Sequence, residues 1–240
     1  MTTTEEIALR LTMKFGGYVT TEFLSLWRPS LQYITNAKLL QSLREDRYLI
    51  VRDEHKLGKM PTIYQVTQRA CAHFGRPNSF LRNKRSIQSV HRSLMRGYYL
   101  FGLLGQGYPE DDLLCYSDER IAFFRNLGIR ERALPAKFNQ GDRVTQIEEH
   151  IMLQSPETGA RGITVLHVNK PQNNEWRQLH SLLENYTLLS QQPECPPLQV
   201  LVICETTKEA VAYQRAVATT KVRHGMRIEV EQLNRAFFAV

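Results

Sequence analysis

The sequence contains no aspartate or glutamate between His55 and Pro109. These 55 residues hold three histidines and nine basic residues, namely Lys56, Lys59, Arg69, Arg76, Arg82, Lys84, Arg85, Arg92 and Arg96. A solvated surface normally mixes both signs of charge, so a segment without acids carries a one-signed field that attracts polyanions. The pattern favours a nucleic-acid partner, and the alternative is a basic surface with no special use.

Other features are missing as well. No apolar run approaches the roughly 20 residues of a membrane span, and the first residues lack the basic and apolar regions of a secretory signal. The four cysteines are far apart without a C-x-x-C pair, which argues against a zinc ribbon or a disulfide framework. There is no Walker loop, G-x-G-x-x-G or H-E-x-x-H motif. We therefore expect a cytoplasmic protein without a membrane partner.

The charge is divided unevenly along the chain. Residues 1–100 carry 16 Lys and Arg against 7 Asp and Glu, a balance of +9, and the other residues carry 15 against 17, a balance of −2. Together these give the net charge of +7. The asymmetry predicts modules with different roles. We expect a DNA-binding domain over 1–75, a basic helical connector over 76–107 and an α/β domain over 108–240.

The first module has the periodicity of a small α+β domain. Hydrophobic spacing and turn residues predict helices over 5–15, 21–27, 31–45 and 67–74, strands over 48–51 and 62–66, and a polar loop over 52–61. Gly16 and Gly17 should end the first helix, and Ser30 is a suitable N-cap for the third. Helix, helix, helix, strand, loop, strand, helix is the order of a winged helix.

The stretch LLQSLREDRYLIVRDEHKLGKMPTIYQVTQRACAHF resembles the recognition helix, wing and following helix of the MarR-like family, over roughly residues 5–75. That family has a glycine just before the first strand, where this chain has Arg47. The resemblance implies that the 31–45 helix enters the major groove and that the 52–61 loop contacts the DNA backbone or minor groove. The implied contacts are Thr35, Lys38, Gln41 and Ser42 on the helix, and Arg52, His55, Lys56 and Lys59 at the wing. Alternatively, these side chains are only a solvated face, or the winged helix docks a protein.

The basic connector is expected to be helical. Ser86 can cap a helix with Ile87, Val90, Leu94, Tyr98 and Phe101 on one face. Its opposite face carries Arg85, Arg92 and Arg96, which with Arg82 and Lys84 extend the expected DNA-binding set. Such a stripe is most often core packing, but it could also form a homodimer. The glycines at 102, 105 and 107 predict a boundary near residue 107.

The second module alternates strands and helices. We expect helices over 117–126, 174–190 and 208–220, and strands within 143–153 and over 162–168, 198–204 and 226–230. This order predicts a small mixed α/β sheet, so the whole chain is expected to be α+β.

The stretch GITVLHVNKPQNNEWRQLHSLLENYTLL resembles the active-site strand and following helix of plasmid replication-relaxation and mobilisation relaxase proteins, whose core is related to PD-(D/E)xK nucleases. That site needs an Asp on one strand and Glu-x-Lys on the next, to hold a divalent metal and stabilise phosphate. Here the second strand reads His167-Val-Asn169-Lys170. Either the site is degenerate and needs no cofactor, or His167 binds Mg²⁺ or Mn²⁺ with Lys170 and a carboxylate from Asp142, Glu148 or Glu149.

Tyr186 is a further candidate, because some relaxases attack DNA with a tyrosine. It lies on the apolar face of the 174–190 helix, so the simpler interpretation is a core tyrosine. The favoured hypothesis is a sequence-specific double-stranded-DNA-binding protein of a mobile element, a mobilisation accessory or a transcriptional regulator with relaxosome or transcription partners. The alternatives are a metal-dependent nickase or relaxase at a plasmid transfer origin, and a protein-docking adaptor.

Overall fold

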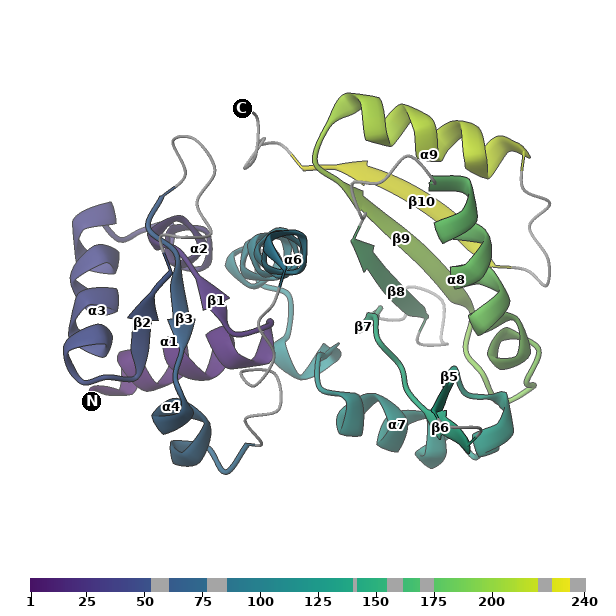
Figure 1. Ribbon diagram of the computed structural model, residues 1–240, viewed down its shortest axis with the longest axis horizontal. Helices are drawn as coiled ribbons and strands as arrows, with labels where there is room; N and C mark the ends of the chain where they lie inside the picture. The colour runs from purple at the N-terminus through teal and green to yellow at the C-terminus, as the bar shows by residue number, and fades with distance from the viewer. Residues whose placement is uncertain are drawn as a thin grey trace. The chain divides into compact units, whose positions relative to one another are not determined.

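The computed structural model describes residues 1–52, 61–76, 86–139, 142–154, 162–168, 175–219 and 226–233. The chain forms two compact units, of which the first contains Met1–Tyr108 and the second begins at Pro109. Both units contain helices and a sheet (Figure 1), so the chain is of the mixed α+β class. Within the described ranges, none of the helices has the length and apolarity that crossing a membrane requires.

The first unit surrounds a three-stranded antiparallel sheet in the order β1-β3-β2. Its elements are α1 (Thr3–Lys14), β1 (Tyr18–Val19), α2 (Thr21–Trp27), α3 (Tyr33–Glu45), β2 (Leu49–Val51), β3 (Tyr64–Val66), α4 (Gln68–His73) and α6 (Ile87–Gly105). A capping box between Thr2 and Glu5 starts α1, and Gly16 and Gly17, with φ of +121° and +84°, follow its end. The strand β1 is only two residues long, which leaves no alternation for a sequence pattern to detect.

The helix α6 is a core element of the first unit and does not merely connect two domains. As expected, Ser86 caps it by accepting a hydrogen bond from the Ser89 amide at 3.3 Å. It packs along α2, and the ring of Phe101 lies 5.1 Å from that of Phe15 and 5.9 Å from that of Phe23. The expected 76–107 connector is therefore corrected over 87–105, because Val90, Leu94 and Phe101 of its apolar stripe are buried within the first unit.

The turn before α3 is longer than the sequence indicated. The amide of Leu31 donates to the carbonyl of Arg28 at 3.1 Å, which closes a turn over residues 28–31. Because of this turn α3 begins only at Tyr33, so Gln32 occupies the N-cap position instead of Ser30. Thr20 is the N-cap residue of α2, but its side chain makes no capping hydrogen bond.

Arg47 connects α3 to β2 in a left-handed conformation, with φ of +62°. A non-glycine residue in this region costs roughly 1–2 kcal/mol, whereas glycine adopts it freely but loses more entropy on folding. We expect Arg47→Gly to raise the free energy of unfolding of the first unit by up to about 1 kcal/mol. Arg44→Gly, inside α3, should instead lower it by about 1 kcal/mol. Urea denaturation of both variants measures this, and a loss of stability in Arg47→Gly would contradict the argument.

The second unit is built on a five-stranded sheet in the order β10-β9-β8-β7-β4, where β8, β9 and β10 are parallel and β7 and β4 are antiparallel. Its strands are β4 (Leu113–Leu114), β7 (His150–Leu153), β8 (Ile163–Val168), β9 (Leu198–Cys204) and β10 (Arg227–Gln232), with a separate hairpin of β5 (Ala136–Asn139) and β6 (Asp142–Thr145). The strand predicted over 198–204 is confirmed as β9, which lies between β10 and β8. The sequence did not separate β6 from β7, between which Ile147 enters the core.

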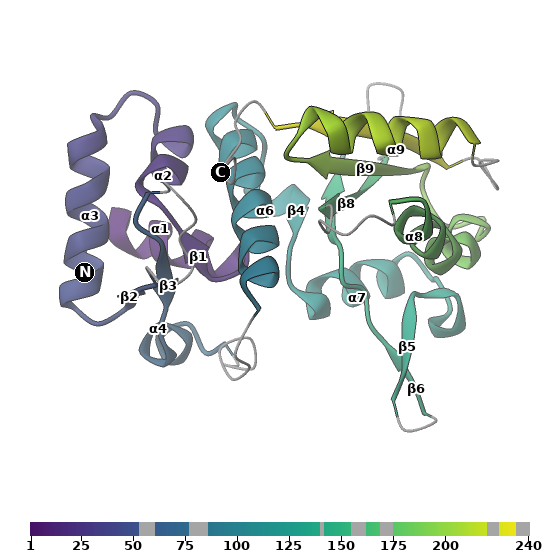
Figure 2. The same cartoon turned by 45° about the horizontal axis from the view of Figure 1, so that its top comes forward.

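Among the described residues of the second unit, the helices are α7 (Ser117–Asn126), α8 (Glu175–Ser190) and α9 (Thr207–Thr219), with short 3-10 turns η2 (Glu110–Asp112) and η3 (Glu131–Ala133). The helices α8 and α9 pack against each other, and α9 runs along β9 and β10 (Figures 1 and 2). Every residue of β8 is buried, which indicates that both faces of this strand are covered. The sheet thus places β8 in the interior of the unit.

Candidate nucleic-acid interface and buried polar cluster

The helix α3 has one buried side and one exposed side. Asn36, Leu40 and Leu43 are buried, and Asn36 donates from Nδ2 to the hydroxyl of Ser25 on α2 at 3.2 Å. This contact fixes α3 against α2 about its own axis. The exposed residues of α3 are Tyr33, Ile34, Thr35, Lys38, Gln41, Arg44 and Glu45.

Three of the four residues expected on the DNA-binding side of α3 are exposed, namely Thr35, Lys38 and Gln41. Gln41 is already engaged, because its Nε2 donates to Glu45 at 2.9 Å and its Oε1 accepts from Arg44 at 3.4 Å. Ser42 lies elsewhere. It is half-buried and hydrogen-bonds Glu5 of α1, and this bond, together with the backbone amide of Thr2, lowers the pKa of the Glu5 carboxyl. Ser42 therefore holds α1 to α3.

Only some of the basic residues that were expected to bind DNA outside α3 lie within the described part of the chain. At the end of β2, Nε of Arg52 donates to Oε1 of Gln65 at 2.6 Å, which orients its guanidinium. Arg92 and Arg96 of α6 are half-buried, and each already has an interaction partner, so they do not form the open basic face that the sequence suggested. The remaining expected contacts lie outside the described residues, namely His55, Lys56, Lys59, Arg82, Lys84 and Arg85.

A separate cluster of polar side chains lies inside the second unit, around Glu149. The antiparallel register that pairs His150 with Leu166 places Glu149 opposite His167. Nδ1 of His167 lies 3.9 Å from Oε1 of Glu149, an ion-pair distance longer than a hydrogen bond. The hydroxyl of Tyr186 on α8 donates to Oε2 of Glu149 at 3.1 Å. Two residues predicted as catalytic candidates, His167 and Tyr186, thus meet at one carboxylate.

Arg120 of α7 adds a buried positive charge to this cluster. Its guanidinium donates to the carbonyls of Cys115 at 2.5 Å and Ile147 at 2.7 Å. The guanidinium also interacts electrostatically with the carboxylate of Glu149. Burial raises the pKa of Glu149, but the contact with His167, the backbone and the Tyr186 hydroxyl outweigh it and lower the pKa overall. The cluster therefore favours an ionised Glu149 between neighbouring donors.

The environment of Tyr186 does not suit a nucleophile. Its side chain is 0% exposed. Burial, and next the negative charge of Glu149, raise the pKa of its hydroxyl well above the ordinary value. Nucleophilic attack needs an accessible and activated oxygen, and neither condition is met. The interpretation of Tyr186 as a core tyrosine therefore agrees with its surroundings.

Of the three carboxylates predicted to join His167 at a metal, Glu149 lies beside it, whereas Asp142 and Glu148 do not complete a ligand set with it. Asp142 and Glu148 are both exposed, and no group of three or more His, Cys, Asp or Glu in the described residues could hold a metal ion. Lys170 and Asn169 lie outside the described residues. The sequence-predicted combination of Asp142, Glu148 and His167 is thus not assembled as a metal site.

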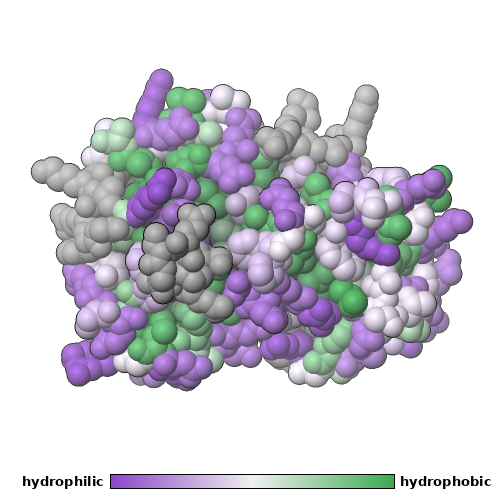
Figure 3. Space-filling model, turned by 180° about the vertical axis from the view of Figure 1, so that it is seen from behind, coloured by the Kyte–Doolittle hydropathy of each residue, from purple (hydrophilic) through white to green (hydrophobic). Residues whose placement is uncertain are grey.

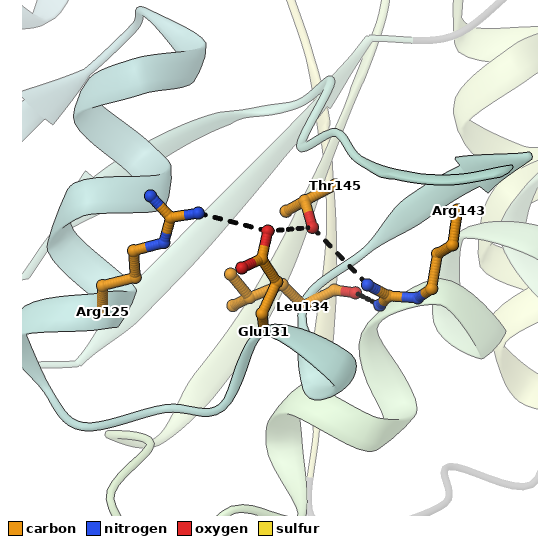
Figure 4. A network of polar contacts seen from close by, with 5 residues as sticks. All are labelled: Arg125, Glu131, Leu134, Arg143 and Thr145. Carbon is orange, nitrogen blue, oxygen red and sulfur yellow. Dashed lines mark hydrogen bonds and ion pairs between the residues drawn. The ribbon is translucent and has the colours of Figure 1, made fainter. Parts of the chain in front are cut away.

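The hairpin that carries Asp142 is held by a surface network (Figure 4). Oε1 of Glu131 accepts from Thr145 at 3.0 Å and pairs with Arg125 at 3.1 Å, and these contacts lower the pKa of the Glu131 carboxyl. Arg143 donates to Thr145 at 3.5 Å and to the carbonyl of Leu134 at 2.7 Å. The network ties β6 to η3 and α7, which gives these charged residues a structural role.

Sequence reasoning missed Arg120 and did not single out Glu149 among three carboxylates. Arg120 follows an ordinary helix start in the sequence, and nothing in its spacing indicates that it is only 4% exposed. Glu149 could have been selected from strand register alone, had the start of β7 been known. Comparison of the chain with protein-family models, with curated proteins and with solved structures finds no match.

Proposed function

We propose that the protein binds double-stranded DNA through the first unit, as a winged helix with α3 as its recognition helix. The observation that carries the proposal is the exposed side of α3, where Lys38 extends from a helix whose opposite side is fixed to α2 and α1. A recognition helix must present one rigid face to the major groove.

The order of elements supports the same proposal. The helices α2 and α3 follow each other across a short turn, and β2 and β3 pair in antiparallel fashion with Leu49 opposite Val66 and Val51 opposite Tyr64. The wing expected over 52–61 lies for the most part outside the described residues. The balance of +9 over residues 1–100 supplies the positive field that phosphates require.

For the second unit we propose a nuclease-like core that does not catalyse a reaction and needs no metal. We propose that the whole protein is a mobilisation accessory or a transcriptional regulator of a mobile element. The path β7, β8, α8, β9 and the position of His167 opposite Glu149 support relation to the PD-(D/E)xK layout. The burial of Tyr186 and the exposure of Asp142 and Glu148 argue against activity.

The proximity of Glu149, His167 and Tyr186 also supports a second candidate, a metal-dependent nickase or relaxase. This candidate predicts that supercoiled plasmid is relaxed in Mg²⁺ or Mn²⁺, and that His167→Ala abolishes the relaxation. Retention of relaxation in His167→Ala would point to a contaminating nuclease and would remove the candidate.

The DNA-binding proposal is tested by reversing the charge of Lys38. Lys38→Glu should weaken binding to duplex DNA by about tenfold or more at moderate salt and reduce the slope of log K against log salt by about 1, because a phosphate contact is lost. Lys208→Glu makes the same charge change at an exposed position on α9 of the second unit, and it should bind as the wild type does. Fluorescence anisotropy with a labelled duplex measures both. Equal weakening by the two variants would show that only net charge matters.

A further inference from the structure

The first turn of α3 exposes large apolar side chains. Tyr33 is 53% and Ile34 is 63% exposed, and Ile34 is the most exposed large hydrophobic residue in the described part of the chain. A single exposed apolar residue is ordinary, whereas two large apolar neighbours exposed in one helical turn leave a larger continuous apolar surface in water, which a binding partner would cover. On one face of the molecule, hydrophobic residues otherwise lie interspersed among hydrophilic ones (Figure 3).

The position of Ile34 on the helix limits what this partner can be. Ile34, Lys38, Gln41 and Glu45 follow at intervals of four, three and four residues, so they form one exposed stripe along α3. The stripe is apolar at its start and cationic one turn later, and no acidic residue lies in the first turn of α3. A surface of this kind complements a polyanion that also offers apolar groups.

The major groove of DNA is such a surface, because each thymine presents a C5-methyl group there beside the phosphate backbone. In helix-turn-helix proteins the residues at the start of the recognition helix contact base edges. Gln32, Tyr33, Ile34 and Thr35 occupy this start and are all exposed. None of the four is the arginine or lysine that pairs with guanine, whereas glutamine pairs with adenine and apolar side chains contact the thymine methyl.

The polar residues further along α3 do not provide a competing readout. The Gln41 amide is held by Glu45 and Arg44, and Ser42 is turned toward α1. Building on the proposed function, we infer that the first turn of α3 recognises A·T pairs by apolar contact of Ile34 and Tyr33 with thymine methyl groups. Lys38 holds the adjacent phosphate and supplies affinity without sequence preference.

The test removes the thymine methyl group from the DNA and, separately, the Ile34 side chain that should contact it from the protein. Duplexes are first selected from a random pool with the full chain, and the thymines of the selected duplex are then replaced one at a time by uracil, which keeps base pairing and removes only the methyl. At one or more thymines we expect uracil to weaken binding by about fivefold to tenfold, as loss of one buried methyl does elsewhere. At the thymine that Ile34 contacts, Ile34→Ala should bind the thymine and uracil duplexes about equally.

Val144→Ala serves as the matched control, because Val144 is an exposed β-branched residue of the second unit, 46% exposed. It should keep the full difference between thymine and uracil, and circular dichroism verifies that each variant is folded. If uracil binds as well as thymine at every position, or the selection enriches no A·T pair, the methyl contact is overturned while DNA binding stands. If Ile34→Ala weakens both duplexes without changing their ratio, the contact is also overturned. Failure of the wild type to bind any duplex at low salt would instead remove the proposed function itself.

Discussion

Gly105→Ala is expected to destabilise the first unit by about 3 kcal/mol, the upper part of the range for overpacking a core. A Cβ at this position would lie 1.9 Å from the carbonyl oxygen of Leu26 and 2.9 Å from its carbonyl carbon. Both are backbone atoms at the end of α2, so no side-chain rotation can relieve the clash. The helices α2 and α6 must therefore separate locally, although their packing forms much of this core.

Gly102→Ala is the matched control in the same helix. A Cβ at Gly102 meets nothing within 4 Å, so the change should stabilise α6 by about 0.5–1 kcal/mol. The two variants are compared by urea denaturation in a Trp176→Phe background, where Trp27 is the remaining tryptophan and reports on the first unit. Equal stability of the two variants would show that α6 does not approach α2 as closely as described.

Glu149→Ala is expected to destabilise the second unit by about 2–4 kcal/mol, since removing one partner of a buried charge cluster leaves the others unpaired. Arg120 is 4% exposed and would lose the charge of Glu149, and Tyr186, 0% exposed, would lose its hydrogen-bond acceptor. Glu148→Ala removes an exposed neighbouring carboxylate and should change stability by less than about 0.5 kcal/mol. Hydrogen exchange of the β8 amides measures the second unit directly.

The destabilisation caused by Glu149→Ala should become smaller as the pH falls. The pKa of Glu149 is lowered in the folded protein, through its contact with His167 and the other donors that outweigh burial. The contribution of ionised Glu149 to the free energy of unfolding is therefore fully present above the pKa of about 4.3 that glutamate has in the unfolded chain. This contribution is lost as the pH falls through the lower pKa of Glu149 in the folded protein. The stability difference between wild type and Glu149→Ala should shrink below about pH 4. A difference that grows on acidification would contradict an ionised Glu149.

Long periodic elements of the fold could be predicted from the sequence, because their burial repeats along the chain. The helix after Ser86 begins at Ile87, and the apolar run from Leu198 to Cys204 is the buried β9. Short strands could not be predicted. Leu113–Leu114 forms β4 only because Met152 and Ile151 lie opposite, and two residues carry no pattern of their own.

The positions of the candidate DNA-binding residues could likewise be predicted only in part. Lys38 and Thr35 could be placed on the exposed side of α3 from helical spacing, whereas Ser42 turns toward Glu5, a contact between helices that spacing does not reveal. Arg47 is instructive, since the sequence has arginine where the MarR-like pattern has glycine, and the chain still adopts φ of +62° there. The tertiary arrangement overrides the local preference of the residue.

We propose that the first unit binds DNA and that the second unit does not cut it. The purified chain should be titrated onto supercoiled plasmid carrying its own upstream region, at several salt concentrations, with EDTA or with Mn²⁺. We expect retardation that weakens steeply as salt rises, because phosphate contacts release counterions, and we expect the plasmid to stay supercoiled in Mn²⁺. Absence of retardation at low salt would contradict DNA binding, and relaxation that requires Mn²⁺ would contradict the non-catalytic second unit.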